Sequence, residues 1–257
     1  MTISFAADSS EADAVHPSRN FGPRKDGQAA DCIILHYTGM ASAQAALGAL
    51  CDPAREVSCH YFVHEDGAVL QLVPEAMRAW HAGASSWQGE RDMNSRSIGI
   101  EIVNPGHAGG VEGGAIAPYP EAQIASVIAL CFDICRRRAI APERVLAHSD
   151  IAPGRKIDPG ETFPWARLHK AGVGHWVAPA PPAKGKILAP GDAGREVTLL
   201  QKRLARYGYG LDISKVYDAQ TERVVRAFQR HFRPALVDGR ADGSTRRTLG
   251  ALISALP

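Results

Sequence analysis

The sequence predicts an α/β fold with a mixed central β-sheet flanked by helices, followed by a small domain of three helices. Short apolar runs typical of buried strands alternate with helical stretches up to about residue 176. A segment rich in Pro, Ala and Lys then covers residues 177–190, and amphipathic helical patterns follow it. We therefore expect a first domain at 1–176, a semi-rigid linker at 177–190 and a helical domain at 191–257. A chain cut after Val177 is expected to keep its chemistry.

The first domain begins with an N-terminal arm, residues 1–30, whose polar composition indicates a segment lying on the domain surface. The apolar run Cys32–Tyr37 is the first predicted strand, and the alanine-rich stretch 41–50 favours a helix. Strand-like runs on both sides of Asp66-Gly67 predict a hairpin, because Asp-Gly suits a turn with positive φ.

The segment Ser97–Val103 shows the alternation of a strand with one buried face. Ile98, Ile100 and Ile102 share one face. Glu101 therefore points away from the isoleucine core.

A long helix and another short strand complete the first domain. Apolar residues from Ile124 to Cys135 recur at helical spacing over three turns, and three arginines follow at the favourable C-terminal end. The run Val145–Ala147 is a further predicted strand that ends directly before His148.

Three amphipathic patterns predict the helices of the second domain. Asp218 and Asp242 each precede one of these helices and suit the N-cap position, which gives a weak internal repeat. The apolar positions of the three helices are Val197, Leu200, Leu204 and Tyr207; Val224, Val225, Phe228 and Phe232; and Leu249, Leu252 and Ile253.

Composition excludes several classes of protein. The 29 basic residues nearly balance the 27 acidic ones, which argues against a nucleic-acid partner. No stretch reaches the roughly 20 apolar residues of a membrane span, and the N-terminus lacks the pattern of a signal peptide.

The five cysteines lie mostly in apolar segments and are expected to be buried and free. Cys59 beside His60 is a weak candidate nucleophile, because a catalytic pair needs spatial adjacency.

Two histidines at strand ends and one aspartate form a candidate metal site. His36 ends one strand, His148 follows another, and Asp158 lies ten residues further on. Two imidazoles and one carboxylate leave the fourth tetrahedral position of zinc open for water, as in catalytic sites. The alternative is an ordinary pair of histidines, since the chain has ten of them.

Four local motifs carry a resemblance to a known family. Over about Asp31 to Trp176 the chain resembles the type 2 N-acetylmuramoyl-L-alanine amidases, the AmpD and AmiD group, which are related to phage amidases and peptidoglycan recognition proteins. The motifs occur in family order and comprise residues 33–38, Trp80-His-Ala-Gly, Ile98-Gly-Ile-Glu and the stretch 148–160.

The resemblance implies a role for five residues. It makes His36, His148 and Asp158 the ligands of one zinc ion per chain, Glu101 the catalytic carboxylate and Lys156 the catalytic lysine. These roles suit amide hydrolysis, which needs an activated water, a proton for the leaving nitrogen and a cation near the developing oxyanion. Without the motifs, Glu101 and Lys156 would be interpreted as solvent-exposed surface residues.

A substrate groove is expected beside the metal site. Aromatic faces suit sugar rings, and amide or guanidinium groups can bind the peptide. The core of the domain is the alternative location for the aromatic residues. The candidate groove residues are Tyr61, Trp80, His81, Asn104 and Arg155.

The second domain resembles the peptidoglycan-binding type 1 module over about Gly191 to Leu256. It departs from the usual pattern at residues 213–216 and at 231–234, which weakens the inference that it binds glycan. The alternative is a helical cap that packs on the first domain and binds nothing.

Together these features predict hydrolysis of the amide between N-acetylmuramic acid, or its anhydro form, and L-alanine of the stem peptide. The expected partners are peptidoglycan or muropeptides. One alternative is a recognition protein that has lost catalysis, and another is a secreted effector that lyses the wall of competitors. The periplasm or cell envelope is the favoured compartment, with the cytoplasm as the alternative because no signal peptide is visible. The sequence determines neither the stem length nor the oligomeric state.

Overall fold

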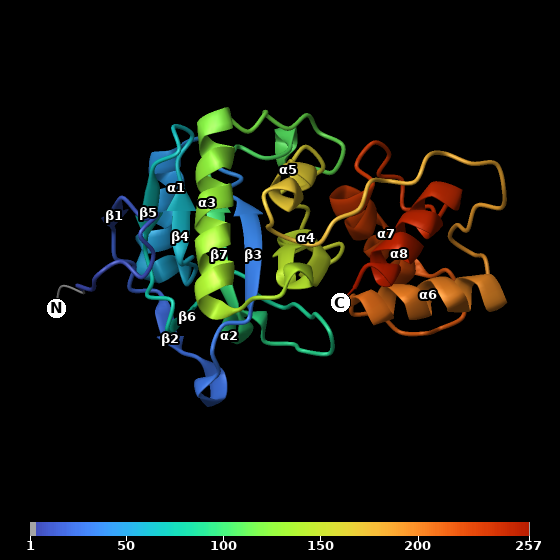
Figure 1. The fold of residues 1–257 in the computed structure, drawn as a ribbon, viewed down its shortest axis with the longest axis horizontal. Coiled ribbons are helices and arrows are strands. Elements are labelled where there is room, and N and C mark those ends of the chain that lie inside the picture. The colour runs from blue at the N-terminus through green and yellow to red at the C-terminus, as the bar shows by residue number, and fades with distance from the viewer. Residues whose placement is uncertain (1–3, 257) are drawn as a thin grey trace.

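The computed structural model describes residues 4–256, which form a sheet-and-helix domain and a three-helix module packed beside it (Figure 1). The strands are β1 (Ala14–Val15), β2 (Phe21–Pro23), β3 (Cys32–Tyr37), β4 (Tyr61–Val63), β5 (Val69–Gln71), β6 (Met77–Ala79), β7 (Ser97–Ile102) and β8 (Val145–Ala147). The helices are α1 (Ala43–Cys51), α2 (Met93–Arg96), α3 (Glu121–Arg138), α4 (His148–Ile151), α5 (Trp165–Lys170), α6 (Arg195–Tyr207), α7 (Ala219–Phe232) and α8 (Gly243–Ser254).

The central sheet is mixed, as predicted. Its strand order is β1-β5-β4-β7-β3-β8, and β4, β7, β3 and β8 run parallel to one another. The predicted hairpin is the antiparallel pair β4–β5, which turns through Gly67 at a φ of +93°. Because parallel neighbours end at the same edge of a sheet, the carboxyl ends of β7, β3 and β8 lie together.

The two faces of the sheet are covered by different elements. Ile98, Ile100 and Ile102 belong to the hydrophobic cluster under α3, as the alternation predicts. Ile34 and Leu146, which belong to β3 and β8, lie in another cluster that continues into the helical module. The module therefore completes the core at this edge of the sheet.

The N-terminal arm differs from the predicted surface segment. It adds β1 to the edge of the central sheet and β2 to a small second sheet with β6. Arg24 is buried, and its guanidinium donates to the carbonyls of Glu75 and Ser97. Buried backbone carbonyls in the domain thus find their donor in the arm.

The helical module has the predicted N-caps. The side chain of Asp218 accepts a hydrogen bond from the backbone of Thr221, and Asp242 accepts one from Thr245. These bonds satisfy amide groups that each helix leaves without an intrahelical partner.

The Pro-rich segment 177–190 follows the surface of the module and is not a free spacer. Leu188 is fully buried and pairs with Ala241 through two backbone hydrogen bonds. The carbonyl of Ala180 accepts a hydrogen bond from the hydroxyl of Ser244. The domain boundaries given above remain a prediction.

All five cysteines are free, and the three in β3, before β4 and in the middle of α3 are fully buried. Within residues 4–256, no helix is long and apolar enough to cross a membrane.

Candidate active site

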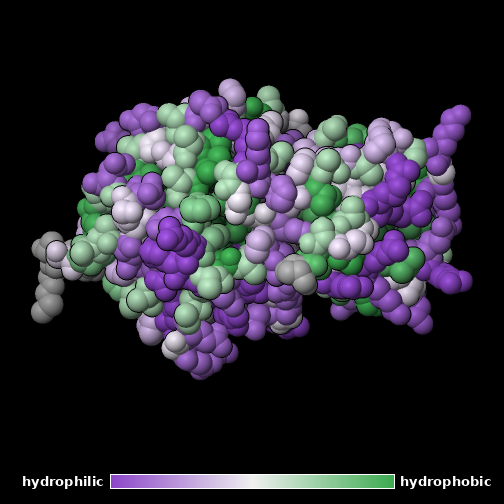
Figure 2. All heavy atoms as spheres, in the orientation of Figure 1, coloured by the Kyte–Doolittle hydropathy of each residue, from purple (hydrophilic) through white to green (hydrophobic). Residues whose placement is uncertain are grey.

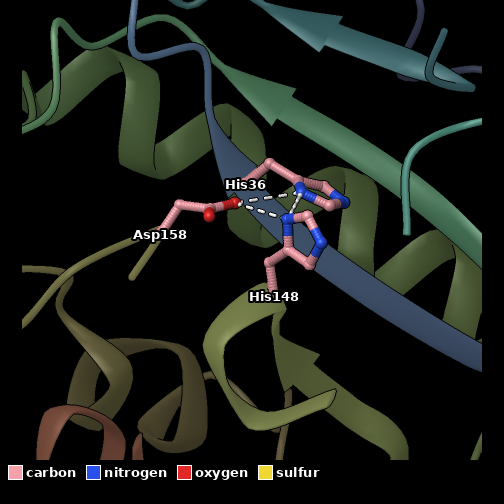
Figure 3. A group of neighbouring side chains, drawn as sticks. All are labelled: His36, His148 and Asp158. Atoms are coloured by element: carbon pink, nitrogen blue, oxygen red, sulfur yellow. Dashed lines mark hydrogen bonds and ion pairs between the residues drawn. The ribbon is translucent and has the colours of Figure 1, made fainter. Parts of the chain in front are cut away.

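Strand register brings the predicted metal ligands together. Leu35 of β3 pairs with Ala147 at the end of β8, and His36 and His148 each follow directly after this pair. His36 is still in β3, whereas His148 begins α4. The loop after α4 returns Asp158 to the same place (Figure 3).

The three side chains meet through one atom each. His36 Nδ1 lies 2.8 Å from His148 Nδ1, and each nitrogen lies 3.0 Å from Asp158 Oδ2. Tetrahedral zinc ligands at about 2.0–2.1 Å from the ion are about 3.3 Å apart. The three atoms, all from buried residues, therefore form a group that can hold a metal ion.

The protonation states also suit metal binding. Burial, together with the neighbouring His148, lowers the pKa of His36 to about 4, although Asp158 opposes this. Burial would raise the pKa of Asp158, but the charge and hydrogen bond of His148, helped by His36, hold it well below its usual range. At neutral pH the site thus presents a neutral imidazole and a carboxylate, the forms that bind metals.

His81 orients His36 from behind. If Nδ1 of His36 binds a metal ion, the proton of the neutral ring is on Nε2, which then donates to Nδ1 of His81, 3.0 Å away. Nε2 of His81 lies 3.3 Å from the hydroxyl of Ser97. A Cβ on Gly99 would lie 2.4 Å from the His81 ring, so only glycine leaves room for this imidazole. Such partners fix the ring orientation and tautomer of a metal-binding histidine.

His148 has an equivalent partner. Its Nε2–H donates to the carbonyl of Ala82, 3.1 Å away. Arg155 donates to the same carbonyl and to that of Ala84, so it braces the loop that supports His148.

Glu101 and Lys156 face the metal group across an open cavity. Glu101 stands beside His36 in the register of β3 and β7, on the face opposite the isoleucine core. Both side chains line a cavity of about 420 Å³ together with His36, His148 and Asp158. Burial and the nearby Asp158 raise the pKa of Glu101 well above its usual range.

One carboxylate oxygen of Glu101 has no hydrogen-bond partner within residues 4–256. Its Oε2 is buried and accepts no hydrogen bond from the described part of the chain. A buried polar atom in that state is costly, so it marks a group kept available for a ligand or for chemistry.

Two of the five predicted groove residues do not reach the cavity. Tyr61 is fully buried in β4, and its hydroxyl donates to Glu75 at 2.6 Å. Asn104 is buried under a loop, where its amide donates to Ala117 and accepts from the backbone of Gly106. The structure contradicts the prediction that these two residues line the groove.

Trp80, His81 and Arg155 do line the cavity. Ser97, behind His81, was not among the predicted site residues. Glycine in the interior of a strand indicates a close approach, so Gly99 was the available signal for this contact.

The fold and this site define a class of enzyme, the metal-dependent hydrolases. Comparison with known proteins specifies it further. The N-acetylmuramoyl-L-alanine amidase family matches residues 26–161, and a putative peptidoglycan binding domain matches residues 193–249. The chain belongs to the N-acetylmuramoyl-L-alanine amidase family.

Several relatives match most of the length of the chain. The chain is 39% identical over 245 residues to N-acetylmuramoyl-L-alanine amidase AmiD of Escherichia coli, covering 90% of this chain and 86% of that protein. It matches the structure of E. coli AmiD in complex with anhydro-N-acetylmuramic acid-L-Ala-D-gamma-Glu-L-Lys with a TM-score of 0.75 and 37% identity, covering 93% and 92% of the two chains. AmpDH3 from Pseudomonas aeruginosa, in complex with anhydromuramic pentapeptide, matches over 100% of both chains with 30% identity and a TM-score of 0.75.

Proposed function

We propose that one zinc ion per chain, held by His36, His148 and Asp158, serves the hydrolysis of the amide between N-acetylmuramic acid and L-alanine. The convergence of three ligand atoms within 3.0 Å of one another at the wall of a cavity carries this proposal. Zinc suits two imidazole nitrogens and one carboxylate oxygen, and when bound it supplies a Lewis acid that activates water.

Glu101 acts as the proton carrier. Its unpaired Oε2 accepts a proton from the attacking water and passes it to the departing L-alanine nitrogen. Lys156, on the same cavity, places a cation near the oxygen that gains charge during attack.

Trp80 and His81 form the part of the cavity wall on which the substrate lies. The aromatic face of Trp80 suits the apolar side of a sugar ring, while both nitrogens of His81 already contact His36 and Ser97. The two solved complexes of relatives hold anhydromuramyl peptides, which supports soluble wall fragments as substrates. We place the enzyme in the cell envelope, where such fragments and the intact wall are both present.

The helical module offers a second surface for the wall. A groove of about 610 Å³ is lined by residues of α6 and α8 together with part of the 177–190 segment. Its charged residues are one acid, Glu196, and four basic residues, so the groove suits the carboxylates of stem peptides. The basic residues are Lys184, Arg203, Arg246 and Arg247. In Figure 2 hydrophilic side chains gather over this outer end of the molecule.

Sedimentation with purified sacculi tests the groove. Arg203→Glu should reduce the pelleted fraction several-fold, because one contact becomes repulsive. Arg206→Glu is the matched control, since this residue is exposed on the same helix and does not line the groove. Equal pelleting of both variants would remove the groove from wall binding.

The metal assignment is tested by zinc content and by mass spectrometry of products. His36→Ala and His148→Ala should each lose zinc and release no L-alanine-terminated peptide from soluble muropeptides. His16→Ala, at an exposed histidine of the arm, should keep both. Stoichiometric zinc in either ligand variant would contradict the assignment, whereas wild-type protein that binds muropeptides without cutting them would be a recognition protein.

A further inference from the structure

The carboxylate of Asp150 joins the helical module to the turn that carries His148. Asp150 lies two residues after His148 in the single turn of α4, and both are buried. Oδ1 accepts a hydrogen bond from the hydroxyl of Tyr209 at 2.6 Å, and Oδ2 accepts one from Nδ1 of His231 at 2.7 Å. Oδ2 also accepts the backbone N–H of Ala147, which closes the turn.

The surroundings hold these donors rigidly. The ring of His231 stacks on Trp165 of the amidase domain with centroids 3.8 Å apart. Tyr209 packs edge-on against Trp87, which is also fully buried. A Cβ on Gly208 would lie 2.4 Å from the Trp87 ring, so the two surfaces meet without spare room.

The module touches the ligand-bearing segment at two further points. Arg223 of α7 packs against Gly154, where an added Cβ would lie 1.9 Å from its side chain. Arg230 lies 3.9 Å from the carboxylate of Glu161, just beyond Asp158. The segment 148–158 supplies two of the three metal ligands. The module therefore contacts this segment at Asp150 and Gly154, and it contacts Glu161 just beyond the segment.

We propose that the helical module is a positioning element of the metal site, in which Tyr209 and His231 hold Asp150 and thereby fix the turn that presents His148. The inference rests on the proposed role of His148 as a ligand. It assigns a function to the unusual sequence at residues 231–234, which the wall-binding role does not explain. Metal ligands must be held within about 0.5 Å of their productive positions. A single helical turn is not stable enough by itself to fix His148 this closely.

Zinc affinity of the full chain tests this positioning role. Tyr209→Phe removes one donor to Asp150, and His231→Leu removes the other. Each should weaken zinc binding about tenfold, the lower end of the effect of removing outer partners of metal ligands. His231→Asn should restore affinity, because its amide places a donor where Nδ1 lies. Competition with a chromogenic chelator gives the dissociation constants.

Tyr217→Phe is the matched control. Its hydroxyl is buried and donates to the carbonyl of Gly239 at 2.6 Å, entirely inside the module. This variant should keep wild-type zinc affinity although it loses a hydrogen bond of the same kind.

Two results would overturn the inference. One is wild-type zinc affinity in both Tyr209→Phe and His231→Leu, and the other is an equal loss in Tyr217→Phe, which would indicate general destabilisation. If His231→Leu does not fold, the zinc affinities of Tyr209→Phe and His231→Asn test the positioning role. Retention of zinc by His148→Ala would instead contradict the assignment of His148 as a ligand. Failure of the positioning role can therefore be distinguished from failure of the ligand assignment.

Discussion

The two sides of the segment 148–158 are built in opposite ways. On the cavity side, His148, Lys156 and Asp158 face open space, and the Oε2 of Glu101 across from them has no hydrogen bond within residues 4–256. On the module side, the carboxylate of Asp150 is fully buried and accepts three hydrogen bonds.

The difference separates the groups that react from the groups that hold them. A buried carboxylate oxygen without a hydrogen bond costs stability, and this cost is tolerated where a ligand or a proton transfer needs the atom free. A fully paired carboxylate gives a fixed geometry. The stability of the segment 148–158 therefore depends on the helical module, while the reaction depends on the groups that line the cavity.

Removal of the module should produce the largest effect. A chain that ends at Val177 leaves Asp150 with one of its three donors and exposes Trp87 and Ile151. Water can replace the two donors that Asp150 loses, so the main cost is the exposure of apolar side chains of the shared cluster, about 1.5–3 kcal/mol for each one that becomes fully exposed. Exposure of several such side chains costs as much as the whole stability of a typical domain.

We therefore expect residues 1–177 to aggregate or to lose zinc, in contrast to the expectation from the Pro-rich linker. Soluble yield, circular dichroism and zinc content measure this. A soluble fragment with native zinc affinity would show that the module is an independent attachment.

Glu101→Gln should give the next largest effect, confined to the cavity side. The rate should fall by about 10² to 10⁴, because the amide cannot accept the proton. Thermal stability should not decrease, since Oε2 has no hydrogen bond to lose in the described structure. Single-turnover rates on a soluble muramyl peptide, with zinc content measured in parallel, check this; normal turnover would remove Glu101 from the mechanism.

Trp80→Ala and Tyr61→Phe should give the smallest effects, and they compare two aromatic residues predicted for the groove. Trp80 lines the cavity, so its truncation should raise KM about tenfold, the loss of one good substrate contact. Tyr61 lies in the core and donates to Glu75, so Tyr61→Phe should leave KM unchanged and lower stability by about 1.5–3 kcal/mol. A rise of KM in Tyr61→Phe would place this residue back in the groove.

Local patterns were enough to predict much of the fold. Alternation in 97–103 correctly placed Glu101 opposite the isoleucines, and the caps at Asp218 and Asp242 follow from their spacing to threonine. The meeting of His36 and His148 depends on strand register, which the sequence implies only through the family resemblance.

The remaining features depend on contacts between distant residues. Asp150 is 59 residues from Tyr209 and 81 from His231, and nothing in the local sequence of any of them indicates the others. The misplacement of Tyr61 has a similar cause, since a tyrosine in a strand suits a core and a groove equally. Composition predicted a semi-rigid linker at 177–190, but composition does not show whether a Pro-rich chain extends into solvent or lies against a surface.

Zinc affinity in Glu101→Gln and Asp150→Asn tests the division between the two sides most directly. Asparagine has one acceptor oxygen where aspartate has two, so it cannot accept from Tyr209 and from Ala147 and His231 at the same time. We expect zinc affinity within about threefold of wild type for Glu101→Gln and at least tenfold weaker for Asp150→Asn. Unchanged affinity in Asp150→Asn, with the protein folded, would contradict it.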